Sequence, residues 1–450
     1  MRTKSAFASS CALFVFIMGC SDEPTSTSGS TSSSSSSGMP SGPPPAAEDK
    51  TRDIVHTDLA VDITALTGTA TITLAPSTSE AASFEAAGLT IADVRNDEGK
   101  LNWAMVDGRL DVGVPKSTTP SKVIVDYTFE HHNGFDGFSQ SGFTLVWPYW
   151  CGNLFPCKSD PSDGLTFGLS VKGEPMGQTS VYPEAIPADA PSYQIAWTTG
   201  EYTKLDLGTT TAGTQIVAYH LAGGEADAQT GTMYLKDTFD WYEKTYGAYI
   251  FGKTAGSVAA NWSPAAYGGM EHHPLWHLGY VAMKDPWIHA HEAAHGWFGD
   301  GVRIACWEDF VLSEGTVSYL EARSITQIMG AAEGQKVWDH YKTRLDNAQA
   351  SAGSHVAWPD SCGVVDILKD KLFGDIPYMK GAFFYKALEG KITAAKLDEA
   401  LASFYMKNKG RAAKMQDLLD EIKAISGYDP QACALAWLRS DALPAEMVCM

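Results

Sequence analysis

The stretch HEAAHGWFGD, residues 291–300, decides the fold of the second half of this chain. It places His291 and His295 four positions apart, with Glu292 directly after the first histidine. Residues four apart lie on one face of an α-helix, so both imidazoles can reach a single metal ion. Glu292 points about 100° away around the helix, beside the ion, where a carboxylate can act as a base. Residues 287–295 contain neither Gly nor Pro, which favours a helix.

Glu314 offers a third metal ligand, since it lies nineteen residues after His295 on the next stretch with helical periodicity. Two nitrogens and one carboxylate leave a fourth position for water, as a catalytic zinc site requires. A zinc ion lowers the pKa of such a water to about 7. The pattern therefore predicts one Zn²⁺ per chain, against the simpler interpretation of a surface helix with two solvated histidines.

Several segments together resemble the M1 family of zinc aminopeptidases, which are gluzincins. HEAAHGWFGD followed by Glu314 is similar to the family signature HExxH-x18-E. Residues 268–272, GGMEH, resemble the GxMEN motif, and residues 378–381, YMKG, resemble the Y-x-K-G segment. FPC at residues 155–157, followed by Asp-Pro and Thr-Phe pairs, resembles a stretch of the family's β-rich region.

The resemblance implies roles in metal binding and catalysis for five residues. His291, His295 and Glu314 would bind zinc. Glu292 would be the general base that takes a proton from the attacking water and later gives it to the leaving amine. Tyr378 would donate a hydrogen bond to the oxyanion, although a tyrosine before Lys-Gly is more often a half-buried packing residue.

The resemblance also implies a substrate-binding segment. Glu271 would bind the free α-amino group of a peptide, which would bring only the first peptide bond to the reactive centre. The backbone of Gly268, Gly269 and Met270 would form an edge strand that pairs with the substrate. Glu271 could instead be a structural ion-pair partner, and the two glycines could mark only a turn.

Three features depart from the family pattern. His272 stands where the GxMEN motif has Asn, and histidine can titrate and bind metal. Asp300 replaces the Asn that usually ends the HxWFGN run. Only 72 residues follow Tyr378, so we expect a short form without the long helical C-terminal domain of many members.

The leading interpretation is therefore a zinc-dependent aminopeptidase acting on peptides with a free N-terminus. A zinc endopeptidase or another hydrolase on the same scaffold is the first alternative. A catalytically inactive binding protein that keeps the fold is the second. The preferred first residue of the substrate and the oligomeric state stay open.

The pattern outside the motif predicts a multidomain α+β protein. Short alternating runs rich in Thr and Val predict a β-rich domain over residues 51–230, and helical periodicity predicts a catalytic domain over residues 231–450. Helices are expected near residues 233–246, 288–297, 313–329, 333–350, 377–388, 396–406 and 415–425. The resemblance implies a saddle-like first domain and a thermolysin-like second one.

The N-terminus resembles the export signal of bacterial lipoproteins. Basic residues precede an apolar run that is too short to span a bilayer, and the run ends in IMGC at residues 17–20. We expect a signal peptide over residues 1–19, a lipidated Cys20, and a Ser- and Pro-rich tether to residue 50. A serine after the cysteine favours an anchor in the outer membrane of a bacterium, whereas an ordinary signal peptide is the alternative.

Charge and cysteine content narrow the class further. The net charge is −20, so an acidic body would repel phosphate backbones and binding to nucleic acid is not expected. An even set of six cysteines follows Cys20, which favours disulfides in an exported chain. The simplest of fifteen pairings joins Cys151 to Cys157, Cys433 to Cys449, and Cys306 to Cys362.

Overall fold

The first half of the chain is built from strands whose side chains alternate between buried and exposed positions. The computed structural model describes residues 43–262 and 268–449. In β1 (Ile54–Asp62) and β2 (Thr67–Leu74), every second side chain is buried over most of the strand. Because side chains on a strand point alternately to its two faces, this pattern packs one face against a core.

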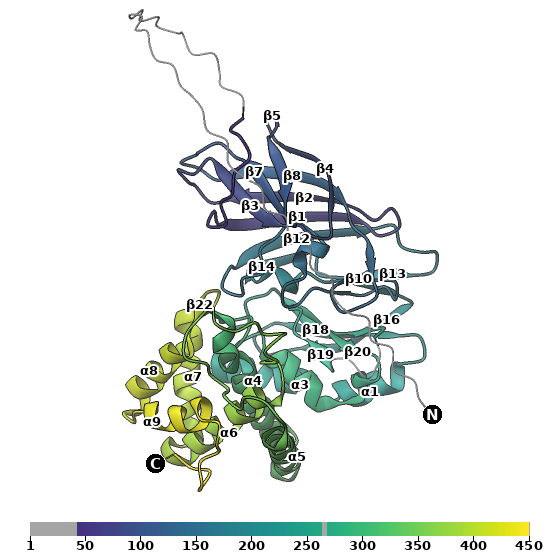
Figure 1. Cartoon of the computed structure of the whole chain (residues 1–450). Coiled ribbons are helices and arrows are strands. Elements are labelled where there is room, and N and C mark those ends of the chain that lie inside the picture. Colours follow the sequence, from purple (N-terminus) through teal and green to yellow (C-terminus); the bar gives the residue numbers. More distant parts are fainter. Residues whose placement is uncertain (1–42, 263–267, 450) are drawn as a thin grey trace, which may run out of the picture. The chain divides into compact units, whose positions relative to one another are not determined.

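A seven-stranded sheet organises this β-rich region (Figure 1). β1 pairs in parallel with β12, whereas its other neighbour, β2, runs antiparallel to it. The order across the sheet is β14 (Ala185–Ala190), β12 (Leu165–Lys172), β1, β2, β8 (Ser121–Thr128), β4 (Thr90–Asn96) and β5 (Gly99–Lys100). A three-stranded sheet contains β3 (Ala81–Glu85), β7 (Arg109–Gly113) and β6 (Trp103–Val106).

Shorter strands complete the region. They are β9 (His131–His132), β10 (Gly137–Ser139), β11 (Thr144–Leu145), β13 (Thr179–Val181) and β15 (Thr198–Gly200). A 3₁₀ turn, η2 (Ser192–Gln194), lies between β14 and β15 and is fully buried. The β-rich character predicted for the first half is confirmed.

A five-stranded sheet joins the two halves of the chain. Its order is β16 (Tyr202–Thr209), β17 (Gln215–Leu221), β18 (Thr254–Ala260), β20 (Leu275–Gly279) and β19 (Gly269–Met270). This sheet runs across the domain boundary predicted at residue 230, because β17 precedes that residue and pairs with both β16, which also precedes it, and β18, which follows it. The change to helical periodicity located the first long helix, but periodicity does not report which strands share a sheet.

Helices dominate the rest of the chain; those between residues 235 and 426 follow the predicted spans closely, whereas the first and the last helix were not predicted. They are α1 (Glu225–Thr232), α2 (Leu235–Tyr246), α3 (Pro286–Ala294), α4 (Phe310–Ile328), α5 (Ala331–Ala350), α6 (Asp375–Ile392), α7 (Ala394–Asn408), α8 (Met415–Ser426) and α9 (Gln431–Ala434). α4 packs along α6 and also contacts α3 and α5. The helical second half is therefore confirmed, with α3 and α4 side by side.

Three disulfides join the pairs that the sequence suggested. They link Cys151 to Cys157, Cys306 to Cys362, and Cys433 to Cys449. The second bond ties the start of α4 to the long loop between α5 and α6. A crosslink between residues far apart in sequence restricts the unfolded chain more than a local one does.

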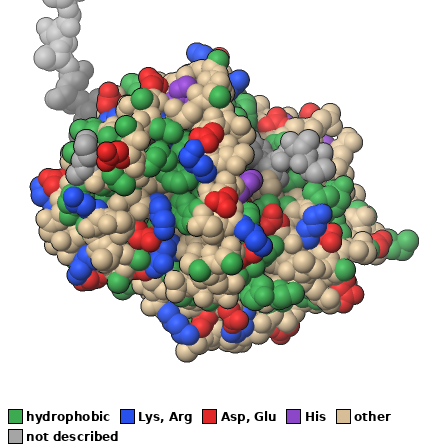
Figure 2. All heavy atoms as spheres, turned by 90° about the horizontal axis from the view of Figure 1, so that it is seen from below, with side chains coloured by type: hydrophobic (Ala, Val, Ile, Leu, Met, Phe, Trp, Pro, Cys, Tyr) green, Lys and Arg blue, Asp and Glu red, His purple; other side chains and the backbone are tan. Residues whose placement is uncertain are grey.

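The predicted signal peptide and Cys20 lie outside the described residues, as does most of the predicted tether. Within residues 43–262 and 268–449, no helix combines the length and apolar character needed to cross a membrane. On the face shown in Figure 2, acidic and basic side chains are interspersed among uncharged ones.

Candidate active site

Helix α3 carries the HEAAH motif and begins at a well-formed cap. Asp285 precedes the helix, and its side chain accepts a hydrogen bond from the backbone N–H of Trp287 at 3.0 Å. Pro286 occupies the first helical position, where its missing N–H costs nothing. His291 and Glu292 lie in the last turn, and His295 follows with a helical backbone. The local sequence thus fixes the relative placement of these three side chains.

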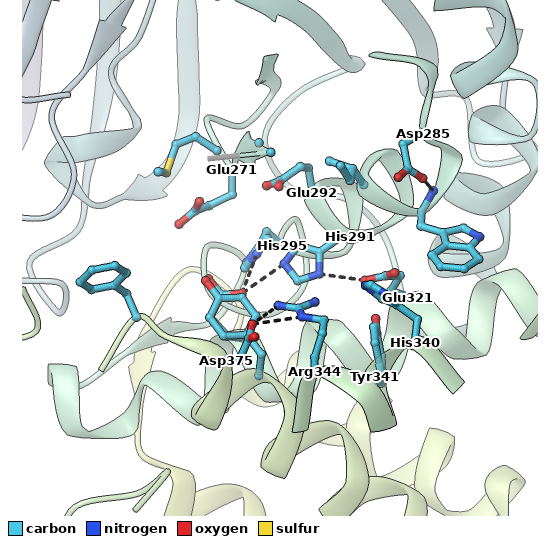
Figure 3. Close-up of a pocket in the computed structure, with 18 of the residues that line it drawn as sticks. Glu271, Asp285, His291, Glu292, His295, Glu321, His340, Tyr341, Arg344 and Asp375 are labelled. Carbon is cyan, nitrogen blue, oxygen red and sulfur yellow. Dashed lines mark hydrogen bonds and ion pairs between the residues drawn. The ribbon is translucent and has the colours of Figure 1, made fainter. Parts of the chain in front are cut away.

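The three predicted metal ligands lie close together, and Figure 3 shows two of them, His291 and His295, side by side. Glu314, on α4, brings its Oε2 atom to 3.1 Å from Nε2 of His291 and 3.5 Å from Nε2 of His295. One ligand atom from each residue lies within 4.8 Å of the other two. The spacing of the motif supplies two of these ligands, and the packing of α4 on α3 supplies the third.

The outer nitrogens of both histidines are held by acceptors. His291 Nδ1 lies 3.1 Å from Glu321 Oε2, and His295 Nδ1 lies 3.1 Å from the carbonyl oxygen of Phe298. An Nδ1–H donated to these groups leaves the Nε2 lone pairs directed toward Glu314, as metal ligation requires. This donor set fits zinc. Glu321 was not predicted, although it lies seven residues after Glu314 and hence on the same helical face.

Buried charge favours a cation between these ligands. Burial alone would lower the pKa of His295, but the Glu314 carboxylate raises it to about 9. Hydrogen bonds to Glu314 and Glu321 raise the pKa of His291 well above its usual value, against the effect of burial. The two histidines in turn lower the pKa of Glu314 to about 2 despite its burial. In the metal-free protein, protons therefore occupy the nitrogens that an ion would use.

Glu292 is buried beside the ligands and close to the edge strand β19. Burial raises its pKa to about 8, although His291 and His295 favour its charged form. A Cβ atom at Gly269 would meet the Glu292 carboxylate and the Leu278 side chain, and both would have to move. Glycine at this position therefore leaves the carboxylate in place beside the strand backbone.

Glu271 directly follows β19 and lies beside the same centre. Ligand atoms of Glu271, Glu292 and His295 lie within 4.8 Å of one another. The hydroxyl of Tyr193, in η2, lies 2.9 Å from Glu271 Oε1 and 3.3 Å from Asp300 Oδ1, and it can donate its proton to one of them at a time. Tyr193 was not predicted, because it is 78 residues from Glu271 in sequence and no motif marks it.

Gly269 and Met270 form the edge strand β19, and Gly268 directly precedes it. β19 is the outermost strand of its sheet and pairs on one side with β20. Gly268 is exposed, and all three residues line the cleft at the ligands. The structure thus places this segment where a peptide could run beside it.

His272 turns away from the cleft. It is buried, its Nδ1 lies 3.3 Å from Nδ1 of His277, and burial lowers its pKa well below the usual value. The described residues that line the cleft include Glu271 but not His272. His272 therefore belongs to the packing behind β19 rather than to the cleft wall.

Tyr378 lies in the first turn of α6, next to the ligands. Its ring stacks on His291 with centroids 6.0 Å apart, and the Arg344 guanidinium lies 5.9 Å from its centroid. Burial and the neighbouring carboxylates raise the pKa of its hydroxyl well above the usual value. The hydroxyl therefore keeps its proton and can act as a hydrogen-bond donor.

The nine predicted site residues all line one cleft of about 580 Å³. Glu271 and Glu292 lie on one side of the two histidines, whereas Arg344 and Asp375 lie on the other (Figure 3). Arg344 Nη2 donates to Asp375 Oδ1 at 2.6 Å. The other described residues of the lining are Trp147, Asp285, Trp287, Ile288, Glu321, His340, Tyr341, Phe373 and Gly374, together with the predicted residues given above.

Comparisons with known proteins agree with this geometry. Residues 286–437 match the model of the peptidase family M1 domain. Leucine aminopeptidase 2 of Emericella nidulans is 26% identical over 326 residues, which cover 64% of this chain and 48% of that protein. Aminopeptidase N of Streptomyces lividans is 26% identical over 227 residues, covering 45% of this chain and 25% of that protein. The chain thus matches about half or less of these curated relatives.

Solved structures share the fold across most of the chain. An M1 zinc metallopeptidase from Deinococcus radiodurans superposes with a TM-score of 0.74 at 19% identity, covering 87% of this chain and 95% of that one. Yeast LTA4 hydrolase in complex with bestatin gives a TM-score of 0.73 at 19% identity, covering 87% of this chain and 68% of that one. The β-rich region and the helical region therefore follow the fold of these structures.

Proposed function

Since the chain carries a peptidase family M1 domain over residues 286–437, we propose that it is a zinc-dependent aminopeptidase that hydrolyses the N-terminal peptide bond of peptides. The observation that carries this proposal is the position of Glu271. Its carboxylate lies within 4.8 Å of Glu292 and His295 ligand atoms, at the end of an edge strand. An amine bound by this carboxylate would bring the first peptide bond of a substrate beside Glu292 and the metal ligands.

His291, His295 and Glu314 would hold the zinc ion. When bound, zinc supplies a Lewis acid that polarises the peptide carbonyl and increases the acidity of water. The contacts of Glu321 and Phe298 with the outer histidine nitrogens hold the ligand set in place. These two acceptors also favour a proton on Nδ1, which leaves Nε2 of each histidine free for ligation.

Side chains and backbone of the cleft carry out proton transfer, stabilise the oxyanion and bind the substrate. Glu292 accepts the proton of the attacking water and passes it to the leaving amine, so one carboxyl serves as base and then as acid. Tyr378 donates a hydrogen bond to the carbonyl oxygen as negative charge develops on it. The backbone of residues 268–270 pairs with the extended substrate, and Glu271 binds its ammonium group.

The test compares free and blocked substrates. The zinc-loaded protein should release amines from aminoacyl fluorogenic amides but not from their N-acetyl derivatives, and a chelator should abolish the release. Glu271→Gln, which removes the charge but keeps the shape, should raise KM for free-amine substrates by about tenfold or more, as expected for loss of a charge-assisted hydrogen bond. Equal hydrolysis of blocked and free substrates would instead favour an endopeptidase or another hydrolase.

We also propose that the protein is exported and held at the cell envelope by a lipid on Cys20. This proposal rests on the sequence IMGC at residues 17–20 and on the Ser- and Pro-rich stretch that follows. A radiolabelled fatty acid should enter the wild-type protein and not a Cys20→Ala variant. A chain that is secreted without label would contradict the anchor.

A further inference from the structure

Helix α3 ends inside the metal-binding motif, so the carbonyl groups of its last turn need donors from outside the regular ladder. The carbonyl of Ala293 accepts from the N–H of Gly296 at 3.2 Å, and that of Ala294 accepts from the N–H of Trp297 at 3.0 Å. The carbonyl of Glu292 instead accepts a hydrogen bond from a side chain, since Nε2 of His273 lies 2.9 Å from its oxygen. The backbone of the general base is thus held by a residue of another segment.

The contacts of His273 fix its tautomer. A backbone carbonyl can only accept, so Nε2 must carry the proton and Nδ1 must hold a lone pair. The hydroxyl of Tyr249 lies 2.8 Å from Nδ1 and therefore donates to it. Burial lowers the pKa of His273 to about 3, so the ring stays neutral. The result is a directed chain from the Tyr249 hydroxyl through His273 to the Glu292 carbonyl.

Packing leaves the His273 ring little freedom. The residue has no exposed surface. Its ring centroid lies 5.6 Å from that of Tyr249, 5.7 Å from that of Phe251 and 5.2 Å from that of Trp276. A ring enclosed on several sides holds its nitrogens in one orientation.

His273 also belongs to the substrate segment, since it follows Glu271 by two residues. The same short segment therefore presents the Glu271 carboxylate to the cleft and donates a hydrogen bond to the backbone of Glu292. A shift of either element would change the distance between the amine-binding carboxylate and the base.

We propose that Tyr249 and His273 are positioning residues that set the spacing between Glu271 and Glu292. This inference rests on the proposed aminopeptidase function for its kinetic consequence. Removing the imidazole leaves a buried carbonyl without a donor and releases the last turn of α3. The loss should therefore reduce the chemical step more than substrate binding.

The kinetic test uses the zinc-loaded full chain and four variants. His273→Ala should lower kcat by about 10- to 100-fold with little change in KM, since small misplacements of catalytic groups have effects of this size. His273→Gln should restore most of kcat, because its amide can donate to the same carbonyl. Tyr249→Phe should cause a smaller loss, since the carbonyl contact survives but Nδ1 of His273 loses its donor and the ring is held less firmly.

His289 provides a matched control, since it lies on α3 as Glu292 does. It is equally buried, and its Nε2 lies 2.9 Å from the carbonyl oxygen of Met283, away from the cleft lining. His289→Ala should lower the melting temperature as His273→Ala does, yet keep kcat near that of the wild type. If kcat follows the melting temperature across all four variants, or if Gln fails to rescue, His273 is only a packing residue.

Two spectroscopic readouts do not depend on activity. The ¹⁵N shifts of the His273 imidazole should report the Nε2–H tautomer, and amide exchange at the end of α3 should accelerate in Tyr249→Phe and His273→Ala. The opposite tautomer, or unchanged exchange in both variants, would overturn the proposal. A wild-type protein that cleaves no peptide would contradict the proposed function. These two readouts would still test the hydrogen-bonded chain from Tyr249 through His273 to the carbonyl of Glu292.

Discussion

The β-rich region and the helical region bury different kinds of side chain. In the central strands β1, β2 and β8, the buried positions are filled mainly by apolar residues such as Val61, Ile72 and Val125. At the contact between α3 and α4, the helical region instead buries Glu292, Glu314 and neighbouring titratable groups. Burying a charge is unfavourable unless it is paired. The comparison teaches that the apolar core runs through both regions, whereas the buried titratable groups of the cleft gather in the helical one.

The separation is incomplete because the β-rich region also contributes to the cleft. Tyr193 reaches Glu271 from η2, and Trp147 lines the cleft. Trp147 packs edge-on against Trp307 with ring centroids 5.8 Å apart. The scaffold therefore completes the site as well as supporting the fold, and variants on each side can test how far the two tasks are separate.

The largest expected effect is on the general base. Glu292→Gln should lower kcat by about 10²- to 10⁴-fold, the usual contribution of general acid–base catalysis. Its melting temperature should be equal to or above that of the wild type, because the change removes a buried carboxyl that pays a desolvation cost. Steady-state kinetics and calorimetry on the same preparation check both points. A strong loss of stability would show that Glu292 supports the fold.

Tyr378→Phe should have the next largest effect. Loss of one oxyanion donor lowers kcat by about 10²- to 10³-fold. Tyr385→Phe on the same helix is the control, since its buried hydroxyl contacts Thr316 Oγ1 at 2.7 Å, outside the cleft lining. Equal activity losses in the two variants would argue against a catalytic hydroxyl at Tyr378.

Zinc affinity should depend on pH in a defined direction. Ligation needs neutral histidines, yet the pKa of His295 is about 9 in the metal-free protein and that of His291 is well above its usual value. Binding at pH 7 must therefore displace protons, and the association constant should rise about tenfold per pH unit for each proton released. The rise should end above pH 9. Calorimetric titrations in buffers of different ionisation enthalpy measure the proton release, and a flat affinity from pH 6 to 8 would contradict this coupling.

The smallest expected effect is on the stability of the β-rich core. Ile72→Val removes one buried methylene from β2 and should cost about 0.5–1.5 kcal/mol of unfolding free energy. Ile72 is fully buried and absent from the cleft lining, so kcat should not change. Denaturant titration and kinetics together make the test. A matching fall in kcat would show that the β-rich core and the cleft are coupled.

Alternation and helical periodicity in the sequence predicted many of the strands and helices. Alternation identified β1, β2 and β8, and helical periodicity located α2 to α8 to within a few residues. Both signals depend on neighbours in sequence, which fix which face a side chain occupies. The boundary predicted at residue 230 shows the limit of such signals, because β17 and β18 pair across it.

The sequence by itself determined the placement of His291, Glu292 and His295 relative to one another, because one helical turn relates them. Motif spacing also indicated Glu271, Glu314 and Tyr378. Only the tertiary structure decided what surrounds them.

Tyr193 reaches Glu271 across 78 residues, and His273 reaches the carbonyl of Glu292 across 19. Contacts of this kind carry no periodic signal. They arise when whole segments pack, and packing depends on the full set of side chains that fill the core.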